Sequence, residues 1–182
     1  MTRPRPGEWV STSLPYLSPE TGAADVWQAE AAARGGTGRQ RIVAAGEVPA
    51  SAEVAALLGL DEGEPVVVRR RLMFLDEVPC EVTDSFYPVR IARGTALAGT
   101  AKIRGGALAL LADLGHVGVR AREDVRAALA DEEECETLQL GPGEAVLKLA
   151  RVLLDAEERP FQADLITMPA RVQRLRYDIR IG

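Results

Sequence analysis

The sequence holds one histidine and two cysteines in 182 residues, few of the side chains on which metal sites and redox centres depend. His116 follows an expected helix end, where a histidine commonly caps backbone carbonyls, and one imidazole cannot build a multi-histidine metal site. Cys80 and Cys135 lie far apart in apolar segments, so we interpret them as reduced core residues. The chain also lacks a phosphate-cradling glycine loop and a Cys-x-x-Cys pair. We therefore expect no metal, no cofactor and no catalytic residue of a recognised enzyme motif.

Long apolar runs and a surplus of positive charge are absent as well. No apolar run approaches the roughly 20 residues that a membrane-spanning helix needs, and the N-terminus lacks the apolar stretch of a signal peptide. We therefore expect a cytoplasmic protein without membrane contact. The formal net charge is −5, which argues against broad binding to a phosphate backbone, because such binding needs clustered, uncompensated lysine and arginine. We expect no binding of nucleic acid by this chain alone.

The composition, 47% hydrophobic and 27% charged residues, is that of an ordinary globular protein, and the length favours one core. Residues 1–20 are rich in proline and have no period, so we predict an irregular N-terminal arm there and the domain itself over residues 21–182. The first predicted element is a helix over residues 24–34, which two glycines end.

An internal repeat is the most informative feature of the sequence. Residues 50–79 align with residues 130–160 at a constant offset of 80, until one extra residue enters the second copy near its end. Identical pairs include Leu58/Leu138, Leu60/Leu140, Gly63/Gly143, Glu64/Glu144 and Arg71/Arg151. A two-fold repeat of this period is too long and has too few copies for a solenoid, so the repeat predicts one sheet built from two related halves.

Each copy reads as a short helix opened by Ser51 or Asp131, a glycine-containing turn and a β-hairpin that turns at residues 76–77 or 155–157. Helical spacing predicts a further helix over residues 104–114, and strict alternation predicts a strand over residues 172–181. The fold class is therefore α+β. We expect a pseudo-duplicated, mainly antiparallel sheet of six or seven strands whose helices cover one face.

The run Arg69-Arg70-Arg71 is the first candidate site. In an alternating strand Arg69, Arg71 and Met73 share one face, where two guanidinium groups can form a fork for a carboxylate or phosphate. The alternative is that the arginines are exposed or paired with surface carboxylates. We favour the binding site, because the repeat places Arg151 at the position equivalent to Arg71.

A second candidate is the segment Lys102-x-Arg104-Gly105-Gly106 at the start of the predicted middle helix. Free backbone N–H groups, glycines that permit close approach and two cations would suit an anion. The alternative is an ordinary loop before a water-exposed helix, and for so short a motif we favour that alternative.

Spaced motifs over residues 40–170 resemble the UTRA domain, the effector-binding half of GntR/HutC-type bacterial transcription regulators. The first half of the resemblance rests on residues 58–67, Arg71 and the segments 76–79 and 84–88, and the second on residues 138–147, Arg151 and residues 155–162. The resemblance implies a chorismate-lyase-like fold with an internal cleft for a small effector. It also implies a homodimer.

The resemblance implies where the ligand contacts fall. Of the family's two arginines spaced two residues apart, Arg71 matches the first and Met73 replaces the second. Other family positions fall at Thr83, near Gly106, at Gln162 and at Met168. Together with Arg69, Ser85, Arg104 and Arg151, these are the expected ligand-binding residues. Because the phosphosugar set is largely replaced, we expect an organic acid or a partly apolar metabolite.

The winged helix-turn-helix head of such regulators needs about 60–70 residues, and only some 20 irregular residues precede the first predicted helix. The leading hypothesis is therefore a sensor domain without its own DNA-binding head. One alternative is an enzyme on the same fold, a lyase, isomerase or cyclase, for which Glu81 and Asp164 are the candidate acid and base. The other is a protein that forms a heterodimer with a full-length regulator.

Overall fold

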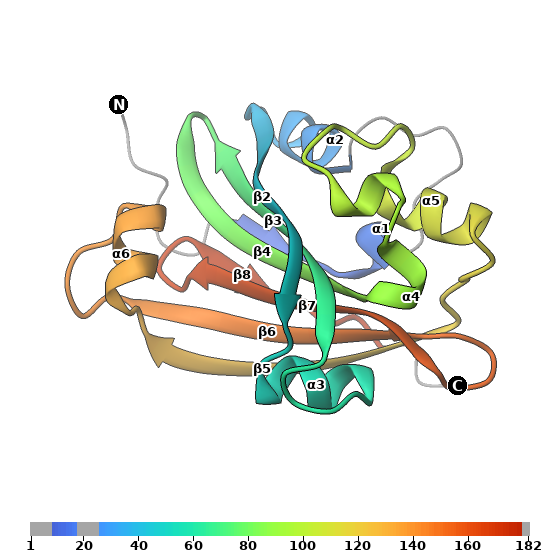
Figure 1. Cartoon of the computed structure of the whole chain (residues 1–182). Coiled ribbons are helices and arrows are strands. Elements are labelled where there is room, and N and C mark those ends of the chain that lie inside the picture. Colours follow the sequence, from blue (N-terminus) through green and yellow to red (C-terminus); the bar gives the residue numbers. More distant parts are fainter. Residues whose placement is uncertain (1–8, 18–25, 180–182) are drawn as a thin grey trace.

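A computed structural model describes residues 9–17 and 26–179 (Figure 1). Six strands form one antiparallel sheet in the order β2-β3-β4-β7-β6-β5, and β1 and β8 form a separate parallel pair. The strands are β1 Trp9–Ser11, β2 Gly38–Pro49, β3 Pro65–Leu75, β4 Val78–Pro88, β5 Arg120–Leu129, β6 Ala145–Leu154, β7 Pro160–Pro169 and β8 Gln173–Leu175. The helices are α1 Leu14–Leu17, α2 Val26–Ala33, α3 Ala52–Leu58, α4 Val89–Ala92, a 3-10 turn Ala96–Ala98, α5 Gly106–Asp113 and α6 Glu132–Leu138. The predicted α+β class is confirmed.

The predicted duplication is confirmed in three dimensions. The elements β2, α3, β3 and β4 of the first half recur in the same order as β5, α6, β6 and β7 of the second half. The halves meet where β4 pairs with β7, and Asp84 lies opposite Leu165 at the centre of that pairing. If the offset of 81 that relates Pro79 to Pro160 is continued along the return strands, Asp84 and Leu165 are equivalent, so the pseudo-two-fold axis of the sheet passes between them.

Local chemistry explains why both short helices form at equivalent places. Ser51 caps α3 by accepting a hydrogen bond from the backbone N–H of Val54, and Asp131 and Glu134 form a reciprocal capping box at the start of α6. Each helix ends at a residue in the left-handed conformation. In α3 that residue is Gly59, whereas in α6 it is Gln139, which adopts φ 55° without the conformational freedom of glycine.

Helices cover both faces of the sheet, so the prediction that they cover one face is wrong. Figure 1 shows α3 and α6 apart from the group formed by α1, α2, α4 and α5. On one face α3 packs against Val66, and on the other Val67 joins a cluster with residues of α4 and α5. Neighbouring residues of one strand point to opposite faces. Both faces of β3 are apolar at its start, and each therefore needs a cover.

The two ends of the chain differ from their predictions. Residues 9–17 were expected to be irregular, but they contain β1 and α1, because Trp9 is buried against Trp27 with ring centroids 5.0 Å apart. The strand predicted over residues 172–181 is only β8, since its one partner, β1, is three residues long. Residues 180 and 181 of that prediction lie outside the described residues.

Two sequence expectations about single residues and spans can be checked directly. Cys80 and Cys135 are both free, and Cys80 is buried as expected of a core residue, whereas Cys135 is only half-buried. In the part of the chain that the structure describes, none of the helices has the length and apolarity that crossing a membrane requires.

Candidate functional site

The three consecutive arginines of β3 have three different environments. Arg69 is 4% exposed and donates hydrogen bonds to the carbonyls of Ala96, Gly99 and Ala101 in the connection between α4 and α5. Burial lowers the pKa of its guanidinium. Because these carbonyls already occupy the donors of Arg69, its guanidinium fastens the α4–α5 connection to the sheet.

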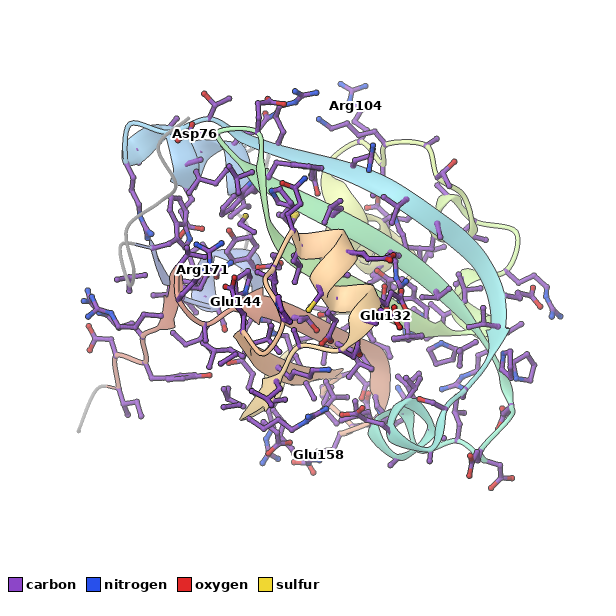
Figure 2. The ribbon with its side chains drawn as sticks, turned by 90° about the vertical axis from the view of Figure 1, so that its left-hand side faces the viewer. Asp76, Arg104, Glu132, Glu144, Glu158 and Arg171 are labelled. Atoms are coloured by element: carbon purple, nitrogen blue, oxygen red, sulfur yellow. The ribbon has the colours of Figure 1, made fainter. Side chains whose placement is uncertain are left out.

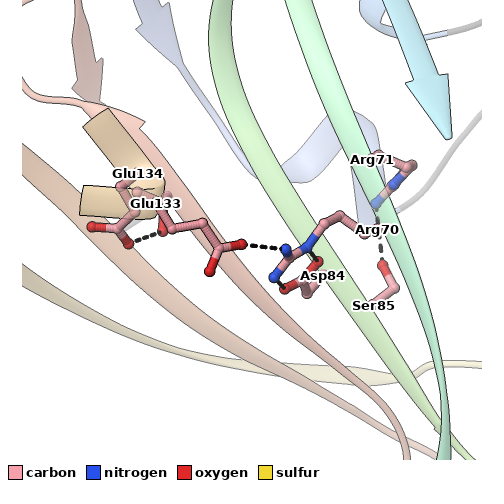
Figure 3. Close-up of polar contacts among 7 residues, drawn as sticks. Arg70, Arg71, Asp84, Ser85, Glu133 and Glu134 are labelled. Carbon is pink, nitrogen blue, oxygen red and sulfur yellow. Dashed lines mark hydrogen bonds and ion pairs between the residues drawn. The ribbon is translucent and has the colours of Figure 1, made fainter. Parts of the chain in front are cut away.

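Arg70 points to the opposite face and holds two carboxylates from different halves of the molecule. Its Nε and Nη2 donate to the two carboxylate oxygens of Asp84 at 2.7 and 2.8 Å, and Nη1 contacts Oε1 of Glu133 on α6 at 2.6 Å (Figure 3). The hydrogen bonds to Asp84, the largest cause, raise the pKa of Arg70. Arg70 therefore ties β3 to β4 and to α6.

Arg71 begins a hydrogen-bond network that crosses the centre of the sheet. Its Nη2 donates to Ser85 Oγ at 3.2 Å (Figure 3), and this hydroxyl donates to Asp164 Oδ1 at 2.6 Å. Gln162 Nε2 also donates to Asp164, at 2.9 and 3.0 Å to its two oxygens. The side chains of Ser85, Gln162 and Asp164 are all buried.

Each end of this network carries a polar atom with no hydrogen-bond partner among the described residues. Arg71 Nε is a buried donor and Gln162 Oε1 is a buried acceptor, and neither contacts a complementary group. A buried polar atom without a partner costs about 1–3 kcal/mol, and these two are half of the four such atoms among the described residues, the others being Trp9 Nε1 and Gln173 Oε1.

A half-buried carboxyl lies beside the network. Thr83 Oγ1 donates to Glu81 Oε1 at 2.7 Å, and burial raises the pKa of Glu81 in spite of that hydrogen bond and the nearby guanidinium groups of Arg71 and Arg151. Burial also raises the pKa of the Tyr87 phenol to about 12. The site face of the sheet, by which we mean the face that carries Arg71, thus has low solvent access.

Arg151, the repeat partner of Arg71, lies on the same face in the second half. Its Nε contacts Glu123 Oε1 on β5 at 2.6 Å, and its Nη2 donates to Ser13 Oγ at 3.0 Å. Ser13 belongs to residues 9–17, a segment we call the strap. The strap is also held by Trp9 and by a hydrogen bond from Tyr16 to Glu30. The strap therefore reaches the second arginine of the site face.

The structure brings together only some of the ten predicted ligand contacts. Arg71, Thr83, Ser85, Arg151 and Gln162 share the site face and its polar contacts. Met73 packs instead with Trp9, Trp27 and Cys80, whereas Met168 packs with Leu149 and Ile166. The two methionines thus belong to separate apolar clusters.

Arg104 and Gly106 are exposed at the start of α5 and make no polar side-chain contact with the network. In the structure this segment is a loop before an exposed helix start, which was the alternative interpretation of its sequence.

Two polar residues of the site face were missed by sequence reasoning. Glu123 could have been found, because it lies on the strand that precedes the second copy of the repeat and alternation gives its face. Ser13 could not, since the path of the strap depends on distant contacts. The candidate acid and base, Glu81 and Asp164, both lie on the site face but accept their hydrogen bonds from different partners, Thr83 for Glu81 and Ser85 and Gln162 for Asp164.

A large groove lies on the opposite face of the sheet, between α3 and α6. Its volume is about 750 Å³, and Arg70 and Asp84 line its centre. A second cavity, of about 20 Å³, lies beside Trp9 and Trp27. None of the ten predicted contacts lines either space. Among the described residues, no group of three or more histidine, cysteine, aspartate or glutamate side chains is arranged to hold a metal ion.

Comparison with known proteins places this geometry in context. A family model described as the UTRA domain matches residues 33–173. An uncharacterized HTH-type transcriptional regulator of Streptomyces coelicolor is 38% identical over 108 residues, which cover 57% of this chain and 40% of that protein. A second match, to an uncharacterized HTH-type transcriptional regulator of Rhizobium meliloti, covers 54% of that protein. The chain therefore spans about half the length of the curated relatives that it matches.

Two solved structures share the fold. The effector domain of PhnF from Mycobacterium smegmatis is 21% identical with a TM-score of 0.71, over 85% of this chain and 94% of that one. The ligand-binding domain of a protein assigned to the GntR family of transcriptional regulators, from Bordetella bronchiseptica, is 28% identical with a TM-score of 0.64, over 73% of this chain and 84% of that one.

Proposed function

The chain belongs to the UTRA domain family, and from this premise we propose that it is a regulatory effector-binding domain whose ligand binds on the site face at Arg71. The observation that carries the proposal is the buried Arg71 Nε without a hydrogen-bond partner. A ligand carboxylate at this atom would satisfy it through a charge-assisted hydrogen bond. The other open position, Gln162 Oε1, would accept from a hydroxyl or N–H group of the ligand.

The charges of the site face favour a ligand with one negative charge. Three carboxylates, Glu81, Glu123 and Asp164, lie on the same face as the guanidinium groups of Arg69, Arg71 and Arg151, so the formal charges of this face balance. A doubly charged phosphate would give this face two excess negative charges, whereas a monocarboxylate would give it one. We therefore propose an organic acid or a partly apolar metabolite rather than a phosphosugar.

The strap controls access in this proposal. Its Ser13 hydroxyl accepts from Arg151 Nη2, which is the kind of contact that a ligand carboxylate would replace. Lifting the strap would also free the Arg151 guanidinium, because Ser13 is the strap residue that contacts it. If the ligand and Ser13 compete for the Arg151 guanidinium, ligand binding shifts the position of the strap.

Calorimetric titration of aromatic and aliphatic monocarboxylic acids tests the site, with candidates chosen by native mass spectrometry of the purified protein. Arg71→Ala should weaken binding by roughly 30- to 1000-fold, the loss expected for a desolvated ion contact. Arg70→Ala, whose side chain lies on the opposite face, is the matched control and should bind as wild type does. If Arg71→Ala retains wild-type affinity while both variants stay folded in thermal melts, the site assignment fails.

We also propose a homodimer. The edge strands β2 and β5 each leave one side of their backbone unpaired in the six-stranded sheet, and a closed two-fold contact is the commonest way to cover such surface. Light scattering at tens of micromolar should give about twice the 19.5 kDa of one chain. A mass of a single chain under these conditions contradicts the proposal.

A further inference from the structure

The groove between α3 and α6 differs in chemistry from the site face. Seven carboxylates and four cationic side chains line it, which gives the lining a net charge of −3. Two of the cations are already paired, Arg70 with Asp84 and Glu133, and Lys148 with Glu134. Four other carboxylates of the lining, those of Glu53, Asp124, Asp131 and Glu136, make no ion pair within the described residues, and neither do the cations of Arg41 and Arg126. The groove therefore has unpaired negative charge on its walls.

The floor of the groove is apolar. Leu72 and Phe74 of β3, Val82 of β4 and Leu165 of β7 lie along it, and Val43 at the rim is 41% exposed. Except for Leu72, these side chains are only half-buried or exposed, although α3 and α6 flank them on the same face. Figure 2 shows α6, with the labelled Glu132, in front of the strands and α3 below it. An apolar floor between acidic walls fits a partner with one apolar stripe and cations on both sides of it.

We propose that this groove binds a basic amphipathic α-helix, with the apolar stripe of the helix on the floor and its lysine or arginine side chains against Glu53 on one wall and Glu136 on the other. An extended peptide fits less well. The floor consists of β3, β4 and β7, which are paired on both sides in the sheet, so a strand lying there would leave its own backbone groups unpaired. A helix satisfies its backbone internally.

The negative charge of the groove lining distinguishes a cationic helix from the other possible partners. A second copy of this chain that presented the same groove would place a net −3 lining against another, and like charges across an interface are unfavourable. Nucleic acid and anionic lipid surfaces are repelled for the same reason. A cationic helix is attracted. The groove lies on the face opposite to Arg71, so the inference does not rest on the proposed function.

Fluorescence anisotropy with labelled peptides of about 18 residues tests the inference, a length sufficient for helix formation on a surface. One peptide carries leucines at helical spacing among lysines. A second has the same composition with leucine and lysine alternating, so that its apolar stripe forms only in a strand. The helical peptide should bind the full chain, and the alternating peptide should bind at least tenfold more weakly.

Charge-reversal variants locate the contact. Glu53→Lys with Glu136→Lys should weaken binding of the helical peptide by about tenfold or more at low salt, as expected when several exposed charge contacts become repulsive. Glu62→Lys with Asp113→Lys changes the net charge equally at exposed positions that do not line the groove, and should change affinity less than twofold. The inference is overturned by any one of three results: no binding of the helical peptide at 100 µM, equal binding of both peptides, or equal affinity of the two double variants.

Discussion

The two faces of one sheet use charged residues in opposite ways. On the site face Ser85, Arg151, Gln162 and Asp164 are buried, and each finds partners inside the protein. On the groove face Arg70 is half-exposed, and several acidic side chains of the lining are fully exposed. A buried polar group must be bonded within the protein, whereas an exposed one can keep its water. Charge on the site face therefore depends on partners inside the protein, whereas charge on the groove face stays in contact with solvent.

The largest effect on stability is expected at Arg69, which is buried on the site face. Arg69→Ala removes the donors to three backbone carbonyls of the α4–α5 connection and leaves these carbonyls and a void in their place. The free energy of unfolding should fall by about 2–4 kcal/mol. Urea unfolding monitored by circular dichroism measures the change.

Arg69→Lys sharpens that result. Lysine keeps the charge but cannot reach several carbonyls with a planar fork, so it should restore only part of the lost stability. If Arg69→Ala is as stable as wild type, water satisfies the three carbonyls in place of the guanidinium. Burial would then not explain a difference in stability between substitutions on the two faces.

A smaller effect is expected at Arg70 on the groove face. Its side chain is 38% exposed, and its ion pairs with Asp84 and Glu133 are open to solvent. Arg70→Ala should therefore lower the free energy of unfolding by about 1 kcal/mol or less, and 0.5 M salt should reduce the difference from wild type. The same urea measurement checks this. A loss equal to that of Arg69→Ala would break the contrast between the faces.

The repeat explains how much of the fold the sequence predicted. An offset of 80 residues predicted both hairpins and both short helices, since identical residues recur at turns and caps such as Gly63 and Gly143. Alternation then predicted that Arg69 and Arg71 share one face. These are local patterns, and each depends on a few neighbouring residues.

The remaining features depend on contacts between distant residues. No sequence pattern indicated that Arg69 would be used up by carbonyls of residues 96–101, or that Ser13 would reach Arg151. Met73 and Met168 were both expected to contact the ligand, because the resemblance placed them at ligand positions, but Met73 is covered by Trp9 and Met168 packs on β6. Packing of the strap, which has no counterpart in the repeat, decides the surroundings of Met73 and Arg151.

The smallest effect on stability is expected for the carboxyl of Glu81, which lies on the site face but is only half-buried. Burial raises its pKa above the ordinary value of 4.5, so the folded protein binds this proton more tightly than the unfolded chain does. The contribution of Glu81 to stability is then fully present below pH 4.5 and is lost as the pH rises through the folded pKa. Glu81→Gln, which stays neutral, should lose less stability than wild type between pH 4 and pH 7.

Thr83→Val gives the opposite change at the same carboxyl. The Thr83 hydroxyl donates to Glu81 and lowers its pKa, so removing the hydroxyl should raise that pKa further and steepen the loss of stability with rising pH. Urea unfolding of wild type and both variants at several pH values measures the slopes. If all three slopes agree, Glu81 titrates as an exposed carboxyl does, and the site face is wetter at Glu81 than its neighbours Thr83 and Ser85 indicate. A shallower slope for Glu81→Gln and a steeper one for Thr83→Val would instead extend the buried part of the site face from Asp164 to Glu81.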